Sequence, residues 1–436
     1  MTIPQLVRAA VAPASGSVWE LTELDRANHF LVLRGTWLFA GGLDAVRLEA
    51  GLRTLLGHYP QYAGRMREGR RVLLDDCGVP LTHEARTDLS VAAISADHAL
   101  ARRLHPRWRQ GRVKRGLDAP LAARLTELPD GQALSVTATH ACGDGRTFYG
   151  FVRDWGRCCR GEPVQAPVLD QALVPPPLEG GKAEVRAAAR EAGWVAPDLL
   201  RGLPVVVRLL LGGLTRRSAP IHLDTAFLDR LRAAAGPGEH GLNDRLTAHL
   251  SRACARLVEQ APSVVCRQAV VLDGRGRLAG VPEAFAGNAA MGASGATFAA
   301  DDPLPEVVAR THTALSPWLA RPSATLEHHV RLARAGAARG VLTAPFDLGA
   351  MHTARPTVFY VNSFVKMPVY DVDFGTPEAP VRPLRAIPHD LPDPILLWPA
   401  PPDRGGVELY LTGRLADALA RRGAEDAWWR ELMLEA

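Results

Sequence analysis

Residues 133–145 read ALSVTATHACGDG, and this stretch decides how the chain is expected to fold. Apolar and polar residues alternate up to His140, which is the period of a β-strand and puts His140 on its apolar face. Large apolar side chains then recur at helical spacing over residues 148–155, so a helix is expected to begin just after Gly145. His140 therefore stands where a buried strand ends and a turn opens. That is a rigid position for a general base.

Length and composition indicate a globular protein with two domains. The 436 residues exceed what one ordinary core holds, and 47% hydrophobic with 22% charged residues is typical of folded domains. Of the 51 cationic residues only Lys114, Lys182 and Lys366 are lysines; the arginines are spread along the chain, and 46 acidic residues nearly balance them. We see no concentrated basic stripe and no nucleic-acid motif, so nucleic acid is not an expected partner.

Cysteine usage and hydropathy point to a cytoplasmic protein. The six cysteines form no CxxC pair, so neither a metal cluster nor a disulfide framework is predicted. Residues 1–17 lack the apolar core of a secretion signal. The most hydrophobic stretch, 199–214, is interrupted by charges and by a proline, which favours an amphipathic helix over a membrane span. His328 and His329 lack the spacing of a zinc motif, so no metal site is expected.

A Pro/Gly-rich break at residues 174–181 separates two halves of the chain. We therefore expect an N-terminal lobe over 1–175, a crossover linker over 176–220 and a C-terminal lobe over 221–436. Helices are predicted at 43–58, 225–235 and 244–260, and strands at 269–272 and 357–361. Strands and helices mixed in both halves predict an α/β architecture.

Six sequence blocks match one known family in that family's order. The HxxxDG signature is met by His140, Asp144 and Gly145, and a DFGWG signature is approximated by Asp373-Phe374-Gly375-Thr376-Pro377. The other blocks are Leu24-Asp25, the YPQYAGR of residues 59–65, the NDRLTAH of residues 243–249, and Asp273-Gly274-Arg275-Gly276-Arg277 followed by Gly287-Asn288. With these blocks the chain resembles the BAHD acyltransferases of the CoA-dependent acyltransferase superfamily and, more distantly, nonribosomal condensation domains.

The resemblance implies two similar lobes of the chloramphenicol acetyltransferase type, with His140 in the middle of a channel between them. It also implies acyl-CoA as a co-substrate, a small-molecule acceptor, a monomer and no permanently bound cofactor. A neutral imidazole removes the acceptor's proton as it attacks the thioester, which contributes roughly 10²–10⁴-fold. No acyl-enzyme is needed. A covalent route through Cys142 is conceivable, but we interpret this residue as a small packing side chain.

Asp144 has three possible roles: a nucleophile, a partner of the base, or the N-cap of the following helix. The resemblance favours a structural role, with the carboxylate paired to Arg275. Replacing either partner by alanine would then abolish activity by destabilising the fold. Gly145 is expected to adopt a backbone conformation closed to other residues.

Asn362, Ser363 and Phe364 stand where the family often has a Ser/Thr-Ser-Trp run facing the acceptor. Asn362 can donate a hydrogen bond, so it is a candidate contact for the oxyanion or the acceptor; the alternative is an ordinary amide at a strand end. Phe364 in place of tryptophan predicts a differently shaped acceptor pocket.

Three classes of function are open to this sequence. The first is transfer of an acyl group from acyl-CoA to a hydroxyl or amine of a small acceptor, in secondary metabolism. The second uses the same chemistry of His140 but takes the acyl group from a phosphopantetheine on a carrier protein, for which a docking surface would be diagnostic. The third is a non-catalytic scaffold, against which the intact His140 argues.

Overall fold

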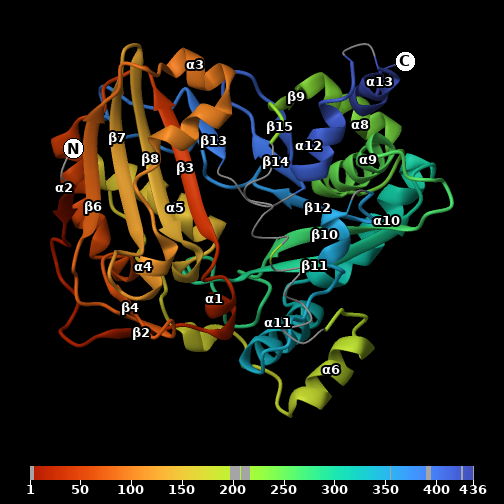
Figure 1. Ribbon diagram of the computed structural model, residues 1–436, viewed down its shortest axis with the longest axis horizontal. Helices are drawn as coiled ribbons and strands as arrows, with labels where there is room; N and C mark the ends of the chain where they lie inside the picture. Colours follow the sequence, from red (N-terminus) through yellow and green to blue (C-terminus); the bar gives the residue numbers. More distant parts are fainter. Residues whose placement is uncertain are drawn as a thin grey trace. The chain divides into compact units, whose positions relative to one another are not determined.

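The computed structural model describes residues 4–196, 207, 217–353, 355–388, 394–423 and 426–435. The chain divides into two units. Unit 1 consists of Met1–Leu173, Pro282–Ala289 and Met367–His389, and unit 2 of Val174–Val281, Ala290–Lys366 and Asp390–Ala436. Each unit is built on a six-stranded sheet with helices packed against it, so the predicted α/β class is confirmed (Figure 1).

The sheet of unit 1 has the strand order β1-β6-β7-β8-β3-β13. Its strands are β1 (Gln5–Val7), β6 (Val79–Ala85), β7 (Leu121–Leu128), β8 (Gly131–Thr139), β3 (Val32–Phe39) and β13 (Arg385–Pro388). β6 and β7 are parallel, and all the other neighbours are antiparallel. A small antiparallel sheet adds β2 (Val18–Glu20), β5 (Arg71–Leu73) and β4 (Arg65–Arg67). The strand that leads to His140 is therefore β8, an inner strand.

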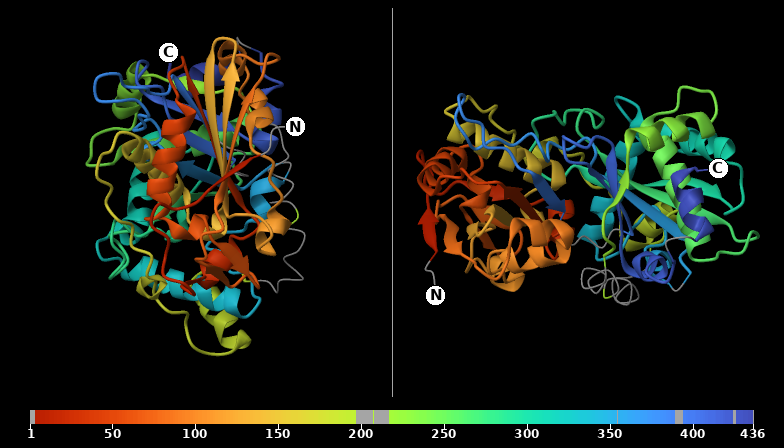
Figure 2. Two further views of the ribbon diagram at one scale, coloured as in Figure 1. Left: turned by 90° about the vertical axis from the view of Figure 1, so that its left-hand side faces the viewer. Right: turned by 90° about the horizontal axis from the view of Figure 1, so that it is seen from above.

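Helices cover both faces of this sheet. α2 (Ala45–Leu56) and α5 (Gly145–Cys159) lie on one face and α3 (Val91–Ala96) on the other (Figures 1 and 2). As a result residues 132–139 of β8 are all buried, not only those of the apolar face that the alternation predicted. The remaining short helices of the unit are α1 (Glu23–Ala27), α4 (Gln110–Lys114), η1 (Pro60–Tyr62), η2 (His98–Leu104), η3 (His140–Cys142) and η4 (Gln171–Leu173).

The α5 helix supplies much of the core of unit 1 because its apolar residues fall on one side at helical spacing. Phe148 and Tyr149 lie against Trp37 of β3, with ring centroids 6.4 and 6.0 Å apart. Trp155, near the other end of α5, donates its indole N–H to the carbonyl of Leu48 in α2. The packing holds the first turn of α5 rigidly next to the end of β8.

Unit 2 has the strand order β11-β10-β12-β14-β15-β9. The strands are β11 (Ala290–Phe298), β10 (Cys266–Asp273), β12 (Val358–Ser363), β14 (Ile395–Pro399), β15 (Val407–Leu411) and β9 (Ile221–Leu223). The helices are α6 (Lys182–Glu191), α8 (Thr225–Ala234), α9 (Leu242–Leu257), α10 (Leu304–Leu319), α11 (Ala324–Ala338), η5 (Gly349–His352), α12 (Gly413–Leu419) and α13 (Ala427–Met433). β12 is parallel to both β10 and β14. The helices and strands predicted for this half are confirmed, with ends shifted by a few residues.

The units are not continuous in sequence, and here the structure differs from the predicted division. Segment 282–289 and segment 367–389 both belong to unit 1, the second because β13 pairs with β3. The motif that begins at Asp373 therefore lies in unit 1, not in a lobe made of residues 221–436. The predicted linker also contains regular structure, since α6 packs on α11 within unit 2. The amphipathic helix predicted for 199–214 lies outside the described residues, apart from Val207.

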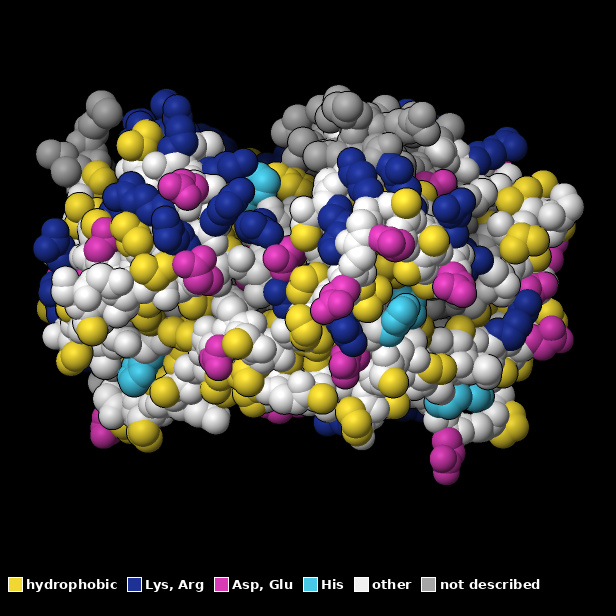
Figure 3. All heavy atoms as spheres, turned by 90° about the horizontal axis from the view of Figure 1, so that it is seen from below, with side chains coloured by type: hydrophobic (Ala, Val, Ile, Leu, Met, Phe, Trp, Pro, Cys, Tyr) yellow, Lys and Arg dark blue, Asp and Glu magenta, His cyan; other side chains and the backbone are white. Residues whose placement is uncertain are grey.

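Two general properties follow from the described residues. None of their helices is both long and apolar enough to cross a membrane. On the face drawn in Figure 3, arginine and lysine side chains lie among acidic ones.

Candidate active site

His140 is placed by the end of a strand. β8 stops at Thr139, and His140 begins the single 3₁₀ turn η3. The His140 N–H still donates to the carbonyl of Leu31 at 3.1 Å, as if the pairing with β3 ran one residue further. Thr139 caps the turn by accepting the N–H of Ala141. The main chain that carries the imidazole is therefore anchored to the central sheet, as the sequence pattern predicted.

The His140 ring is suited to accept a proton. The residue is half-buried, and its Nδ1 is buried with no hydrogen-bond partner among the described residues. Burial lowers the pKa of His140, against opposing effects of the Asp144 charge, the residue's own backbone and the Asn288 side chain. The imidazole is thus neutral at physiological pH, which is the form that acts as a base.

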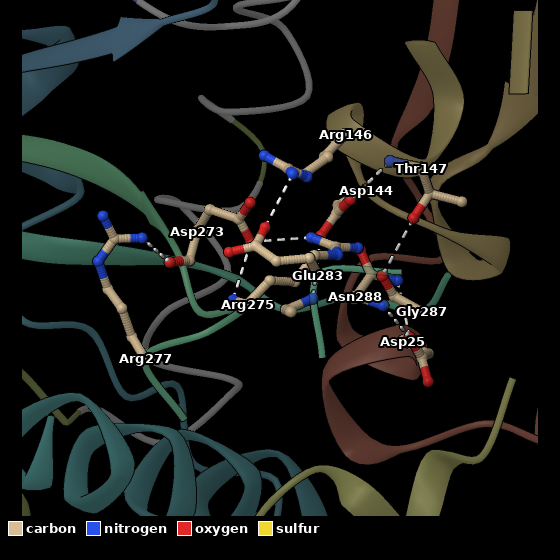
Figure 4. Close-up of polar contacts among 11 residues, drawn as sticks. Asp25, Asp144, Arg146, Thr147, Asp273, Arg275, Arg277, Glu283, Gly287 and Asn288 are labelled. Carbon is tan, nitrogen blue, oxygen red and sulfur yellow. Dashed lines mark hydrogen bonds and ion pairs between the residues drawn. The ribbon is translucent and has the colours of Figure 1, made fainter. Parts of the chain in front are cut away.

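Asp144 is engaged through both carboxylate oxygens. Its Oδ1 accepts the N–H of Thr147 at 3.1 Å and so caps α5, while Oδ2 accepts the N–H of Ala289 at 3.0 Å (Figure 4). The residue is 1% exposed. Of the roles considered for Asp144, the contacts correspond to the N-cap, with an added task of holding segment 282–289 against the start of α5.

The expected partner of Asp144, Arg275, belongs to unit 2. It is 1% exposed, and its Nη1 donates to Oδ1 of Asp273 at 2.9 Å. A pair between Asp144 and Arg275 stays a prediction.

The special glycine of the turn is Gly143 and not Gly145. Gly143 has φ +152°, and a Cβ there would lie 2.7 Å from Cγ2 of Thr147. Gly145 is the first residue of α5 and has no positive φ. The positive φ is needed where the chain leaves η3, before α5 begins. The predicted position, Gly145, is therefore wrong by two residues.

Asn288, which the sequence analysis treated only as part of a family block, contacts the turn of His140, and Asp25, from another such block, contacts Asn288. Asn288 donates from Nδ2 to the His140 carbonyl at 2.9 Å and to Oδ1 of Asp25 at 2.7 Å. Asp25 is fully buried, and Asn288 is 1% exposed. Nothing in the local pattern around either residue indicates this contact, since they are 263 positions apart. The available indication in the sequence was that both residues are polar and lie in blocks that match the family.

Cys142 is also buried next to the turn. It is 0% exposed, and burial, with the nearby charge of Asp25, raises the pKa of its thiol well above the ordinary value. The thiolate that a covalent mechanism would need is therefore strongly disfavoured.

The other predicted contacts lie together in unit 2, at the end of β12. Asn362 is 9% exposed and sits opposite Leu396 of β14. Ser363 donates its hydroxyl to the side-chain oxygen of Asn243 at 3.3 Å. Phe364 packs on Trp398 with ring centroids 5.5 Å apart. A role of these residues toward the oxyanion or acceptor stays a prediction.

The motif at Asp373 lies at the far end of α5. Phe374 packs edge-on against Trp155, and Gly156 leaves no room for a side chain against the Asp373 carbonyl. Gly145 and Gly156 are eleven helical rises apart, which correspond to about 16 Å. The motif therefore supports the packing of unit 1 at a distance from His140.

Comparison with known proteins finds a family model and several named acyltransferases that are similar to this chain. The model of the Transferase family matches residues 39–192, which include the whole HxxxDG segment. Agmatine coumaroyltransferase-1 of Hordeum vulgare is 26% identical over 94% of this chain and 93% of its own length. Putrescine hydroxycinnamoyltransferase of Oryza sativa subsp. japonica is 27% identical over 77% of each chain. The chain is thus similar to the Transferase family over residues 39–192 and to named acyltransferases over most of its length.

Solved structures share the fold of this chain. TRI101 of F. sporotrichioides, determined with coenzyme A and T-2, has a TM-score of 0.70 and 16% identity over 95% of this chain and 98% of that one. The first condensation domain of the calcium-dependent antibiotic synthetase has a TM-score of 0.58 and 17% identity, over 96% of both chains. The two units thus have the fold of lobes of the chloramphenicol acetyltransferase type, as the resemblance implied.

Proposed function

We propose that this enzyme transfers an acyl group from acyl-CoA to an amine of a small acceptor, with His140 as the general base. The observation that carries the proposal is the neutral, half-buried imidazole of His140, held on a rigid turn at the end of β8. Relatives named for agmatine and putrescine favour an amine over a hydroxyl acceptor and a hydroxycinnamoyl group as the donor's acyl part.

In the proposed reaction the acceptor nitrogen attacks the thioester carbonyl carbon while His140 takes one of its protons. The carbonyl π electrons move to oxygen and give a tetrahedral oxyanion. When the oxyanion collapses, the C=O bond reforms and the C–S bond breaks. The imidazolium then returns the proton to the departing sulfur, so the products are an amide and free CoA thiol.

Direct transfer is favoured over an acyl-enzyme. Cys142 is the nucleophile nearest to His140 in sequence, but its side chain is buried and its pKa is raised well above the ordinary value. A thiol held neutral and shielded from solvent is a poor nucleophile. We propose Asn362 as a hydrogen-bond donor to the oxyanion or to the acceptor, with Ser363 and Phe364 shaping the acceptor side.

The test is thiol release from a panel of acyl-CoA donors, including coumaroyl-CoA and acetyl-CoA, with agmatine, putrescine or an alcohol as acceptor. The product of each reaction is identified by mass. We expect release with an aromatic acyl-CoA and an amine, and an amide product of matching mass. Release with alcohols alone would contradict the amine assignment. No release from any CoA donor, with product formed from an acyl-loaded carrier protein, would favour the condensation-type function.

A further inference from the structure

A buried hydrogen-bond network lies directly behind the His140 turn, entirely within unit 1. Asp25 is its centre. One carboxylate oxygen, Oδ2, accepts the N–H and the hydroxyl of Thr22, each at 2.7 Å, and this closes a capping box at the start of α1. The other, Oδ1, accepts the side-chain amide of Asn288 at 2.7 Å. Figure 4 shows Asp25 and Asn288 side by side.

The amide of Asn288 joins this carboxylate to the main chain of the base. Its NH₂ group has two hydrogens; one goes to Asp25 and the other to the His140 carbonyl at 2.9 Å. Within η3 the same carbonyl accepts the N–H of Gly143 only at 3.4 Å. Asn288 therefore provides the shorter of the two hydrogen bonds that hold the His140 carbonyl.

Asn288 is itself fixed from the opposite side. Its neighbour Ala289 donates to Asp144, and the Gly287 carbonyl accepts the hydroxyl of Thr147 at 3.4 Å. Asp25 and Asp144 thus hold the 287–289 backbone from its two sides. Because a hydrogen bond to a charged acceptor is short and strong, the carboxylate of Asp25 orients the Asn288 amide toward the His140 carbonyl.

The charge on Asp25 fits this role. Burial raises the pKa of Asp25 to about 6, while hydrogen bonds from Asn288 and Thr22 lower it. At pH 7.5 the carboxyl is therefore mostly ionised. A buried charge of this kind is tolerated because both of its oxygens are hydrogen-bonded.

We propose that Asn288, oriented by Asp25, is a positioning residue for catalysis: it fixes the His140 carbonyl and thereby the direction of the imidazole. The proposal rests on the proposed function of His140 as the base. Misplacement of a catalytic group by about 1 Å can cost 10²-fold in rate, so loss of this anchor should lower kcat and leave substrate binding nearly intact.

The first test compares Asn288→Ala with the control Gln132→Ala, with kcat and KM measured at pH 7.5. The control also removes a buried side-chain amide, one that is hydrogen-bonded to the backbone of Leu43 at the opposite end of β8 from His140. We expect Asn288→Ala to lose at least about 30-fold in kcat with KM changed less than about threefold, and Gln132→Ala to keep kcat near the parent value. Asn288→Ala with the parent's kcat would overturn the proposal, as would equal losses of kcat in both variants.

A charge swap separates positioning from stability. In the double variant Asp25→Asn with Asn288→Asp, the amide at 25 donates to the carboxylate at 288, so their mutual hydrogen bond is restored. The carboxylate at 288 has no hydrogen to give to the His140 carbonyl. We expect the swap to recover the Tm lost in Asn288→Asp while kcat stays low. Recovery of both kcat and Tm would contradict positioning, and recovery of neither would contradict the pairing of the two residues.

The failures of the two proposals are distinguishable. A parent enzyme that releases no thiol contradicts the proposed function. An active parent with an unimpaired Asn288→Ala variant contradicts only the positioning role.

Discussion

At the scale of single residues, the chemistry of His140 depends on its surroundings more than on its identity. A histidine in water titrates near physiological pH, but burial at the end of β8 lowers the pKa of this one and keeps it a base. The charge of Asp144 acts in the opposite direction while its oxygens hold the backbone. The Asp144 carboxylate therefore has two roles: its charge opposes the lowering of the His140 pKa, and its oxygens hold the backbone.

Asp144→Ala should destabilise the protein and lose activity with it. The variant removes the cap of α5, worth about 0.5–2 kcal/mol, and leaves the buried N–H of Ala289 without an acceptor, worth about 1–3 kcal/mol. Arg275→Ala should also be destabilised, because it leaves the carboxylate of Asp273 without its arginine. Thermal unfolding checks both. Inactive variants as heat-stable as the parent would show that the two residues act on catalysis directly.

Cys142→Ala should keep kcat within about threefold of the parent. The thiol is buried and its pKa is raised well above the ordinary value, so no step is expected to use it. The measurement is thiol release with the best donor and acceptor pair, together with the intact mass of the enzyme after mixing with donor alone. A large fall in kcat, or an acylated parent protein, would establish a covalent route.

At the scale of helices and strands, the parts predicted correctly are those in which local pattern and packing agree. Alternation ending at His140 predicted β8, and apolar spacing from Phe148 predicted α5. The contact of Asp25 with Asn288 could not be predicted, because no periodicity links positions 263 apart. The conformationally special glycine was predicted at Gly145 but is Gly143 for a similar reason. The close approach of the Thr147 side chain, which the sequence spacing does not reveal, leaves no room for a side chain at position 143.

The α9 helix contains a buried histidine that should make stability depend on pH. His249 is 1% exposed and shares a 2.8 Å hydrogen bond with the Leu432 carbonyl; burial lowers its pKa from 6.5 to about 4. Between pH 6.5 and about pH 4, His249 is therefore protonated in the unfolded chain but neutral in the folded protein. Stability is fully present above pH 6.5 and is lost as pH falls toward 4, by roughly 3 kcal/mol.

The matched variant is His249→Gln, whose amide N–H can donate to Leu432 but does not titrate. Urea unfolding at pH 7.5 and pH 4.5 should show a smaller acid loss in the variant than in the parent. The comparison is made between the two proteins because Asp25, with its pKa raised to about 6, contributes with the opposite sign in an overlapping range. Equal acid losses would mean that His249 is accessible or charged in the native state.

At the scale of the whole molecule, each unit is assembled from distant parts of the chain. The sheet of unit 1 is complete only with β13, and Trp37 of β3 donates its indole N–H to the carbonyl of Val369. Segment 282–289 supplies the partner of the buried Asp25. The break at 174–181 was visible in composition. The sequence did not reveal that segments 282–289 and 367–389 belong to unit 1, because contacts between residues so far apart in sequence leave no local pattern.

A fragment of residues 1–173 should consequently fail to fold on its own. It would expose one edge of β3 and leave the Asp25 carboxylate without the Asn288 amide. We expect weak dispersion in its NMR spectrum and no cooperative thermal transition, whereas the full chain shows both. A fragment that unfolds cooperatively would mean that the N-terminal part forms a complete domain.

The most direct measurement is the rate of CoA thiol release by the parent and by His140→Ala, with one acyl-CoA and one amine at saturating concentrations. Circular dichroism and Tm confirm that the variant is folded. We expect kcat to fall by about 10²–10⁴-fold in His140→Ala, and the rate of amide formation to fall by the same factor. A folded His140→Ala variant with the parent's kcat would contradict the assignment of His140 as the base.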